Sequence, residues 1–250
     1  MLVAIDIGNS RIKAGKFTDN KLTEFHFFDK VDETLSFLKI SPKEDFALSS
    51  VVPDKTKIIS EGIKKITGNP PFVVTKDVKT NLTIDYKSPE TLGTDRLCSA
   101  EGAFFLFKNS EKYKNYKEGF YILSIDFGTA TTINIIEHPG KFIGGLIAPG
   151  LGMMFESLRQ RTAQLPLLNL SDFVTIIGKD TKSSIVSGVV TSVVGMIEKT
   201  INTLPLQNVF ICITGGNAKN IIPYLNFDFV YKEGLVLYGI NALWKLSKNS

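Results

Sequence analysis

The chain has 250 residues, of which 43% are hydrophobic and 22% charged, and its net charge is +4. These values are ordinary for a globular protein with one large domain or two smaller ones, and the weak positive charge does not indicate a nucleic-acid partner. The N-terminus lacks a basic segment and Asp6 interrupts its short apolar run, so no signal peptide is expected. The longest apolar stretch, Ile185–Ile197, is too short and too polar to span a bilayer. We therefore expect a cytoplasmic protein without a membrane partner.

The cysteines and histidines do not form a metal-binding pattern. Cys98 and Cys212 lie far apart in apolar surroundings, which favours buried free thiols. His26 and His138 are the only histidines and have no partner at metal-ligand spacing, so a His-based metal site is not expected.

The first part of the chain predicts a mixed sheet with helices. Asp19-Asn20 is a turn between two strand patterns, while Asp54 is a candidate helix cap and Gly68 is placed to end that helix. A hairpin meander followed by strand, helix and strand is typical of such a sheet. The expected elements are strands near 2–8, 11–17 and 22–28, a helix over Val31–Leu38, a strand over Phe46–Val52, a helix over Asp54–Thr67 and a strand from Pro71 to Val74.

The middle of the chain predicts a helix followed by a boundary. Pro89 and Gly93 interrupt the pattern, and a helix is expected from about Asp95 to Phe107 with Thr94 as its N-cap. The stretch Lys108–Glu118 has no periodicity, which indicates a surface loop. We expect this loop to divide the chain into lobes of residues 1–115 and 116–250.

The last part predicts a second sheet with helices. Small residues are interleaved through Ser183–Thr203, which indicates a helix packed closely against another, and we expect it at an interface between two copies of the chain. The glycine-rich exit Thr214-Gly215-Gly216-Asn217 follows a strand, where α/β sheets usually hold ligands. The expected elements are strands over Phe120–Ile136 and Phe142–Ala148 around a turn at Pro139-Gly140, a helix to about Arg161, a helix over Ser183–Thr203, a strand over Val209–Ile213, a further helix and a helix over Glu233–Leu246.

A repeated hairpin pattern links the two parts of the chain. Leu2–Lys13 and Ile122–Asn134 each contain an apolar run, an aspartate, one apolar residue, a glycine and small polar residues. This order predicts a strand, a tight turn and a returning strand, with the aspartate at the strand tip. Glycine at each turn permits either a positive φ or a close backbone approach, and short polar side chains there suit an anion. We expect two related lobes facing a shared polyphosphate. The residues concerned are Asp6, Gly8, Asn9, Ser10, Asp126, Gly128, Thr129, Thr131 and Thr132.

Several of these residues also have an ordinary structural explanation. Asp6 alone is most simply a turn-forming aspartate, and Asp95 a first-turn acidic residue that stabilises its helix. The sequence around Lys13 also fits a solvated lysine on a strand. Arg96 also fits a cation on the surface, and the Gly215-Gly216 pair also fits a turn that leads into a helix. The second copy of the hairpin favours a functional role for the aspartates.

Further motifs occur in the order found in one enzyme family. Each is weak alone, but the ordered set covers nearly the whole chain. The chain resembles the type III pantothenate kinases, within the superfamily of acetate and sugar kinases, heat-shock chaperones and actin. The motifs are DIGNSRIK at Asp6–Lys13, GTDR at Gly93–Arg96, DFGTATT at Asp126–Thr132, GGLIAPGL at Gly144–Leu151, TAQLP at Thr162–Pro166 and IGKDTKSSIVSG at Ile177–Gly188.

The resemblance implies both a fold and a reaction. The fold would be α/β, with two related actin-like (ribonuclease H-like) lobes, each a mixed sheet with helices, and a cleft between them. The reaction would be ATP-dependent phosphorylation of pantothenate to 4'-phosphopantothenate, the first step of coenzyme A biosynthesis. The resemblance also implies magnesium, a monovalent cation (potassium or ammonium) and a homodimer.

The resemblance assigns roles to individual residues. Asp95 would accept the proton of the substrate hydroxyl, Asp6 would hold magnesium, and Thr181 would reach the substrate across the dimer. Asp126 would hold the monovalent cation, although contact with magnesium through water explains this residue equally well. The nucleotide-binding set is Asp6, Ile7, Gly8, Asn9, Ser10, Arg11, Ile12, Lys13 and Thr129, and the substrate-binding set is Tyr86, Gly93, Thr94, Asp95, Arg96 and Thr181.

Two departures and two other functions accompany this interpretation. Ser10 stands where the family usually has threonine, and Lys108–Glu118 is longer than is typical. The chain is also consistent with a kinase for another hydroxylated metabolite, or with an actin-like ATP-binding regulator that has no catalytic role. Asp95 favours an enzyme, because a pure switch needs no acceptor carboxylate at a second pocket. A DNA-binding protein is least favoured, since no helix carries a basic stripe.

Overall fold

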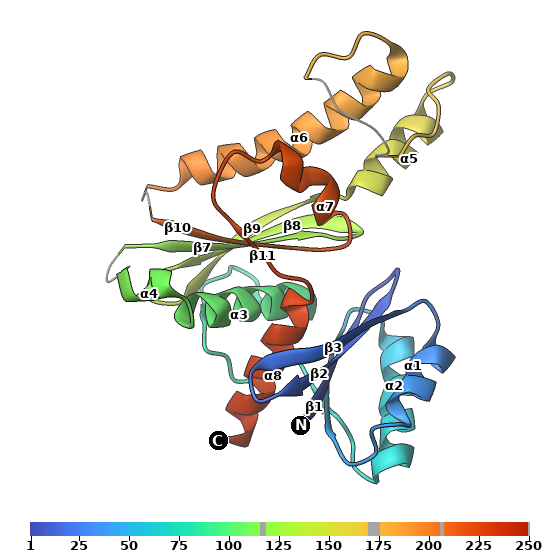
Figure 1. Cartoon of the computed structure of the whole chain (residues 1–250), viewed down its shortest axis with the longest axis vertical. Helices are drawn as coiled ribbons and strands as arrows, with labels where there is room; N and C mark the ends of the chain where they lie inside the picture. The colour runs from blue at the N-terminus through green and yellow to red at the C-terminus, as the bar shows by residue number, and fades with distance from the viewer. Residues whose placement is uncertain (116–118, 170–175, 206–207, 250) are drawn as a thin grey trace.

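Two mixed β-sheets with a pair of crossing helices between them form the centre of the molecule (Figure 1). The computed structural model describes residues 1–115, 119–169, 176–205 and 208–249. The first sheet has the strand order β3-β2-β1-β4-β5, in which β1 is antiparallel to β2 and parallel to β4. Its strands are β1 (Leu2–Ile7), β2 (Ile12–Thr18), β3 (Lys21–Phe28), β4 (Asp45–Ser50) and β5 (Phe72–Val73).

The second sheet repeats the plan of the first. Its order is β11-β10-β7-β8-β9-β6, and β7 is antiparallel to β8 and parallel to β10. Without the outer strand β6, the order β9-β8-β7-β10-β11 corresponds strand for strand to the first sheet. The expectation of two related lobes is therefore confirmed. The strands are β6 (Thr83–Ile84), β7 (Tyr121–Phe127), β8 (Ala130–Glu137), β9 (Lys141–Pro149), β10 (Val209–Thr214) and β11 (Val230–Tyr231).

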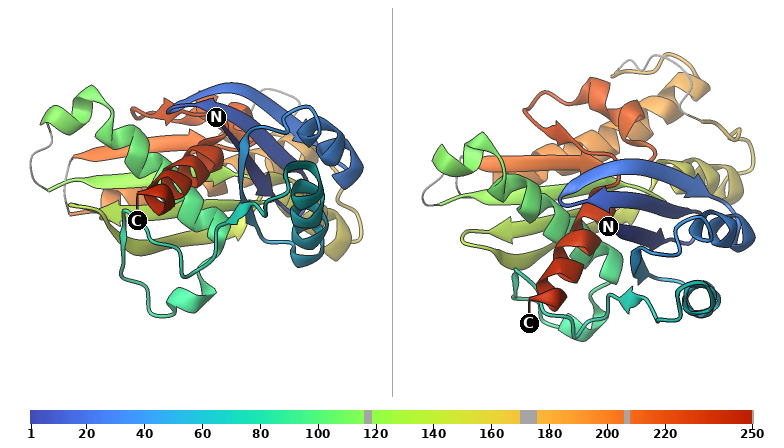
Figure 2. Two further views of the ribbon diagram at one scale, coloured as in Figure 1. Left: turned by 90° about the horizontal axis from the view of Figure 1, so that it is seen from below. Right: turned by 60° about the horizontal axis from the view of Figure 1, so that its bottom comes forward.

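Helices cover both faces of each sheet, in layers that Figure 1 shows from the side. Helices α1 and α2 pack on the outer face of the first sheet, and α5 and α6 on the outer face of the second. Helices α3 and α8 lie between the sheets, and both views of Figure 2 show α8 against the first sheet. The helices are α1 (Val31–Leu38), α2 (Pro53–Thr67), α3 (Thr94–Lys108), α4 (Glu111–Asn115), α5 (Leu151–Arg161), α6 (Thr181–Thr203), α7 (Ala218–Ile221) and α8 (Leu235–Lys248), with short 3-10 turns η1 (Pro89–Thr91) and η2 (Ile222–Tyr224).

The alternation of side chains along the two central strands directs both aspartates inward. In β1, Val3 and Ile5 enter the core under α1 and α2, whereas Leu2 and Ala4 face α8. Asp6 shares the second face, because residues two apart lie on the same side of a strand. In β7, Ile125 faces α6 and Ile122 faces α3, so Asp126 also points toward the space between the sheets.

Several local expectations are wrong in detail. Asp54 and Thr94 are not N-caps: Val52 precedes the helix that begins at Pro53, and Gly93 precedes the one that begins at Thr94. Proline at the first helical position has no N–H to cap, which explains the shift in α2. Gly68 ends α2 with a φ of 79°, as expected. The strands β6 and β11 were not expected from the sequence.

The expected loop Lys108–Glu118 is only partly a loop. Lys108 is the last residue of α3, residues 111–115 form α4, and residues 116–118 lie outside the described part of the chain. The division at residues 115 and 116 stays a prediction. Two segments cross it, since β6 joins the second sheet and α8 covers the first.

Helix α6 is longer than its apolar stretch suggested. Among the described residues it alone has the length and composition of a membrane span, with 23 residues and a mean hydropathy of 1.4 over its most apolar window. The expectation concerned the shorter stretch Ile185–Ile197, and it stays a prediction. Core helices share this composition, and 39% of that window is buried inside the fold, so α6 is weak evidence for a membrane span.

Candidate functional site

The two repeated turns meet between the sheets. The Ser10 and Thr129 hydroxyl groups are hydrogen-bonded at 2.8 Å, although 119 residues separate them. Asp6 lies opposite Lys13 in the β1–β2 register, and Asp126 lies opposite Thr132 in the β7–β8 register. The fold thus brings both acidic strand tips to one place.

The glycines of these turns meet the expectation of a positive φ or a close backbone approach at Gly8 only. Neither Gly8 nor Gly128 has a positive φ. A Cβ at Gly8 would lie 3.1 Å from the Arg11 carbonyl oxygen, whereas one at Gly128 would make an ordinary contact of 3.4 Å. Both amides already donate within their own turns, Gly8 to Arg11 and Gly128 to Ala130. Close approach therefore accounts for Gly8 only, and neither amide is available to an anion.

The rest of the expected nucleotide segment is divided between the core and the surface. The Ile7 and Ile12 side chains are fully buried beneath α1 and α2, so only their backbone atoms can face a ligand. Arg11 is exposed, and its Nε lies 3.2 Å from Asp29 Oδ1. The Asn9 carbonyl accepts a hydrogen bond from Lys55 Nζ at 3.3 Å.

Lys13 supplies the positive charge of the cluster. Its Nζ lies 3.3 Å from Asp6 Oδ2 and donates a hydrogen bond to it. The charge of Asp6 is the main reason that the pKa of Lys13 is raised; burial opposes this effect, and Asp126 and Asp95 reinforce it. A solvated strand lysine does not describe this residue, because only 25% of its side chain is exposed. Lys13 is a permanent cation among three carboxylates.

Asp126 has an oxygen atom that lacks a partner. Oδ1 is buried and has no hydrogen-bond partner among the described residues. Burial is the main reason that the pKa of Asp126 is raised, while the positive charge of Lys13 lowers it. Gly215 lies against this oxygen with a φ of 101°, and a Cβ there would come within 2.5 Å of it. A buried carboxylate oxygen without a donor fits a bound cation.

Asp95 stands at the start of α3, beside the same cluster. The Thr94 hydroxyl donates to the Ser50 carbonyl and accepts from the Ser49 hydroxyl, which fixes the helix start to the end of β4. Ser49 is the register partner of Asp6, so the helix begins next to that acidic tip. Burial is the main reason that the pKa of Asp95 is raised; hydrogen bonds from backbone N–H groups lower it, and the charge of Asp6 raises it further.

Arg96 is buried one residue further along α3. It is only 6% exposed, its Nε donates to Asn134 Oδ1 at 2.8 Å, and its Nη1 lies 3.5 Å from the Tyr86 hydroxyl. The Tyr86 and Phe142 ring centroids are each 5.8 Å from the guanidinium carbon. Nη2 is buried without a partner among the described residues. Arg96 is therefore not a surface cation, and part of its donor capacity is unused.

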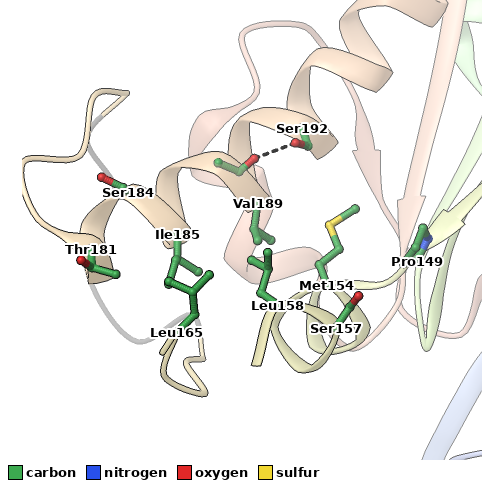
Figure 3. Close-up of a pocket in the computed structure, with 11 residues that line it drawn as sticks. Pro149, Met154, Ser157, Leu158, Leu165, Thr181, Ser184, Ile185, Val189 and Ser192 are labelled. Atoms are coloured by element: carbon green, nitrogen blue, oxygen red, sulfur yellow. Dashed lines mark hydrogen bonds between the residues drawn. The ribbon is translucent and has the colours of Figure 1, made fainter. Parts of the chain in front are cut away.

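Thr181 lies apart from these residues. It begins α6, which covers the outer face of the second sheet, whereas Asp95 and Arg96 are on α3 at the inner face (Figure 1). Thr181 instead borders an open, mainly apolar cavity of about 800 Å³ between α5 and α6. Figure 3 shows Met154, Leu158 and Ile185 pointing into this cavity. Within one chain, the second sheet separates Thr181 from Asp95.

Sequence reasoning missed several neighbours of the site. Ser49, Asn134 and Phe142 hold or flank the expected residues, but none was named as a site residue, although Asn134 ends the repeated stretch Ile122–Asn134. A polar residue at a core-facing position of an apolar strand was the available signal for Asn134. Among the described residues, no group of three or more His, Cys, Asp or Glu side chains is arranged to hold a metal ion.

Comparison with known proteins identifies the family. A family model described as type III pantothenate kinase matches residues 2–203. The type III pantothenate kinase of Dictyoglomus turgidum is 34% identical over 91% of both chains. Type III pantothenate kinase 1 of Francisella tularensis subsp. holarctica is 34% identical over 99% of this chain and 100% of its own.

Solved structures with low sequence identity to this chain share its fold. A protein from Campylobacter jejuni described as a candidate Baf family transcriptional activator has a TM-score of 0.65 at 19% identity, covering 99% of this chain and 100% of its own. Component A of (R)-2-hydroxyglutaryl-CoA dehydratase from Acidaminococcus fermentans has a TM-score of 0.54 at 13% identity, covering 99% and 98%. These likenesses and the paired sheets show the actin-like α/β fold. By its family-model match and its relatives, the chain belongs to the type III pantothenate kinases.

Proposed function

We propose that the chain transfers the γ-phosphoryl group of ATP to the primary hydroxyl of pantothenate, the first step of coenzyme A synthesis. The observation that carries this proposal is the cluster of Asp95, Asp6, Asp126 and Lys13, which interact electrostatically between the two sheets. Family membership supplies the substrate, and the cluster supplies the chemistry. A cytoplasmic location is consistent with such metabolism.

The two turns would hold the ATP phosphates. Lys13 contributes charge, and the Ser10 and Thr129 hydroxyl groups, which now bond to each other, would turn to phosphate oxygens. Phosphoryl transfer passes through a loose transition state, so positioning and charge account for most of the catalysis. We therefore propose that the residues that bind the nucleotide are Asp6–Lys13 and Thr129.

Asp95 would act as the proton acceptor. The hydroxyl oxygen forms a bond to the γ-phosphorus, the bond from phosphorus to the β,γ-bridging oxygen breaks, and ADP leaves with that electron pair. The hydroxyl proton passes to the Asp95 carboxylate. Because burial raises the pKa of this carboxyl, it is a better base than an ordinary aspartate.

Arg96 would bind the carboxylate of pantothenate. Its unpartnered Nη2 is a donor, and carboxylates pair well with guanidinium groups. Tyr86 flanks the same guanidinium, while Gly93 and Thr94 shape the start of α3 beside it. These residues form the proposed substrate side of the site.

Two cations would complete the site. Asp126 fits the monovalent cation, potassium or ammonium, because its Oδ1 is buried without a donor. Asp6 fits magnesium, since magnesium takes few protein carboxylates and keeps phosphate and water ligands. Magnesium bound with ATP would neutralise charge on the phosphates. The residues of the chain would hold both ions and orient the reactants.

Thr181 requires a second copy of the chain to take part. Since the second sheet separates it from Asp95, contact with the substrate would come from α6 of a partner in a homodimer. The small exposed residues of α6 and the apolar cavity beside α5 support this interface.

A product assay tests the proposed function. We expect 4'-phosphopantothenate to form from ATP and pantothenate with magnesium, and to fall sharply when potassium and ammonium are replaced by sodium. Turnover of another hydroxylated metabolite in place of pantothenate would show that pantothenate is not the substrate. Nucleotide binding without any acceptor-dependent turnover would favour the regulator instead.

A further inference from the structure

A buried chain of polar side chains lies behind Arg96. Arg96 Nε donates to Asn134 Oδ1 at 2.8 Å, Asn134 Nδ2 donates to Ser124 Oγ at 3.1 Å, and Ser99 Oγ donates to the same Ser124 oxygen at 3.1 Å. Asn134 and Ser124 are fully buried, and Ser99 is 1% exposed. This series of hydrogen bonds thus extends from the substrate side of the site into the core between α3 and the second sheet.

The topology explains why these side chains meet. Ser124 and Asn134 are directly opposite each other in the β7–β8 register. Their neighbours two residues away, Ile122 and Ile136, face the core under α3. Ser99 lies three residues after Arg96 on α3, on the same side of the helix.

The hydrogen bonds fix the orientation of the Asn134 amide. Its oxygen accepts from Arg96 and its nitrogen donates to Ser124, so a flipped amide would place a donor against the guanidinium and lose the bond to Arg96. Asn134 therefore holds Arg96 by one edge, through Nε. The Nη2 donor remains without a partner among the described residues.

The charge of Arg96 is not neutralised by a direct ion pair in this arrangement; its effect on the neighbouring Asp95 carboxyl is the smallest of those that shift the pKa of that group. None of the ion pairs among the described residues includes Arg96. Its nearest polar contacts, Asn134 and Tyr86, are neutral groups. A buried charge is costly unless it is paired. The site is thereby prepared for an anion that arrives with the substrate.

We propose that Asn134 is a positioning residue that makes the site select a carboxylate. It holds the guanidinium in place and, because the amide is neutral, leaves its charge for the substrate. A carboxylate at position 134 would pair with Arg96 inside the protein and compete with the substrate anion. This inference rests on the proposed contact between Arg96 and the pantothenate carboxylate.

The Asn134→Asp variant tests this role with two substrates. One is pantothenate, and the other is its neutral analogue in which the carboxylate is reduced to an alcohol. We expect the KM for pantothenate to rise at least tenfold, with kcat within threefold of the unaltered protein. The KM for the neutral analogue should change less than twofold. The melting temperature should be unchanged or higher, because the buried guanidinium gains a partner.

Two further variants control for folding and for charge. Asn69→Asp makes the same change at an exposed position and should leave both KM values unchanged. Ser124→Ala removes the group that orients the Asn134 amide without adding charge, and should raise the KM for pantothenate about threefold while sparing the neutral analogue. This second variant tests the proposal if Asn134→Asp does not fold.

The outcomes separate this inference from the Arg96 assignment. If the unaltered protein binds both substrates equally well, or if Arg96→Met keeps the preference for pantothenate, the Arg96 contact itself is wrong. If Arg96→Met abolishes the preference but Asn134→Asp and Ser124→Ala preserve it, the role of Asn134 is overturned. Equal changes in both KM values, or a change in kcat alone, would show a purely structural role.

Discussion

Asp95 combines a helix-start position with burial beside another carboxylate. Burial raises its pKa more than the two backbone N–H bonds lower it, and the negative charge of Asp6 adds to the rise. The base form is lost as the pH falls through this raised pKa. The acid limb of kcat/KM is therefore expected above the ordinary aspartate value of about 3.9. A pH profile measures this midpoint, and a limb at or below that value would be inconsistent with Asp95 as the base.

Lys13 is the residue whose charge opposes the rise in the pKa of Asp126. In Lys13→Met, Asp6 loses its ion-pair partner and the pKa of Asp126 rises, because Lys13 lowers it in the unaltered protein. We expect kcat/KM to fall by about 10²–10³-fold, as when a charge-stabilising donor is lost. Steady-state kinetics at several pH values test this. Lys13→Arg should recover part of the activity, and the exposed Lys21→Met should retain all of it.

The helices α3 and α8 are the elements that join the two sheets. They cross with backbones in contact: a Cβ at Gly239 would collide with the Cys98 backbone, and one at Gly102 with the Leu235 carbonyl. Only glycine permits this approach, so the position of α3, and with it Asp95, depends on the crossing.

Gly239→Ala tests the crossing directly. The added methyl group has no space, so we expect a loss of about 1–3 kcal/mol in unfolding free energy and a melting temperature lower by several degrees. Gly152→Ala is a matched control in α5, where a Cβ would have no atom within 4 Å. Thermal unfolding compares the two variants. Equal melting temperatures would show that the helices have room to separate.

The elements also show what the sequence could predict. The repeated pattern around Asp6 and Asp126 specified both hairpins, because alternating apolar residues and an acidic strand tip are local features. Strands β6 and β11 have two residues each, too few for a period-2 pattern. The partners of Arg96 depend on how α3 docks against β8, which no local pattern encodes. The aspartates were therefore predictable, but the groups that orient Arg96 were not.

At the scale of the whole molecule, one residue of the proposed site, Thr181, lies apart from the others within a single chain. Thr181 and the cavity belong to α5 and α6 on the outer face of the second sheet, whereas Asp95 belongs to α3 on the inner face, so the proposed contact of Thr181 with the substrate requires a dimer. Val190 is buried in the core of the single chain, and a substitution there would disturb folding rather than association. Gly188 and Ser192 are exposed on α6 and border the cavity, so they are the better positions to alter.

The variant carrying Gly188→Arg and Ser192→Arg tests the dimer. Two arginines on this surface should repel their counterparts, so sedimentation should show a monomer with an unchanged melting temperature and reduced activity. Ser36→Arg, at an exposed position of α1, is the control and should remain dimeric. If the double variant sediments as the unaltered protein does, α6 is not part of the dimer interface.

The central claim is that the carboxylate of Asp95 receives the hydroxyl proton beside the ATP held by the two turns. Asp95→Asn keeps the shape of the side chain and removes the base, so kcat should fall about 10²–10⁴-fold while ATP affinity, measured by calorimetry, stays within about twofold. Asp54→Asn, an exposed change on α2, should have no effect. Phosphopantothenate formation by Asp95→Asn at the rate of the unaltered protein would contradict the account.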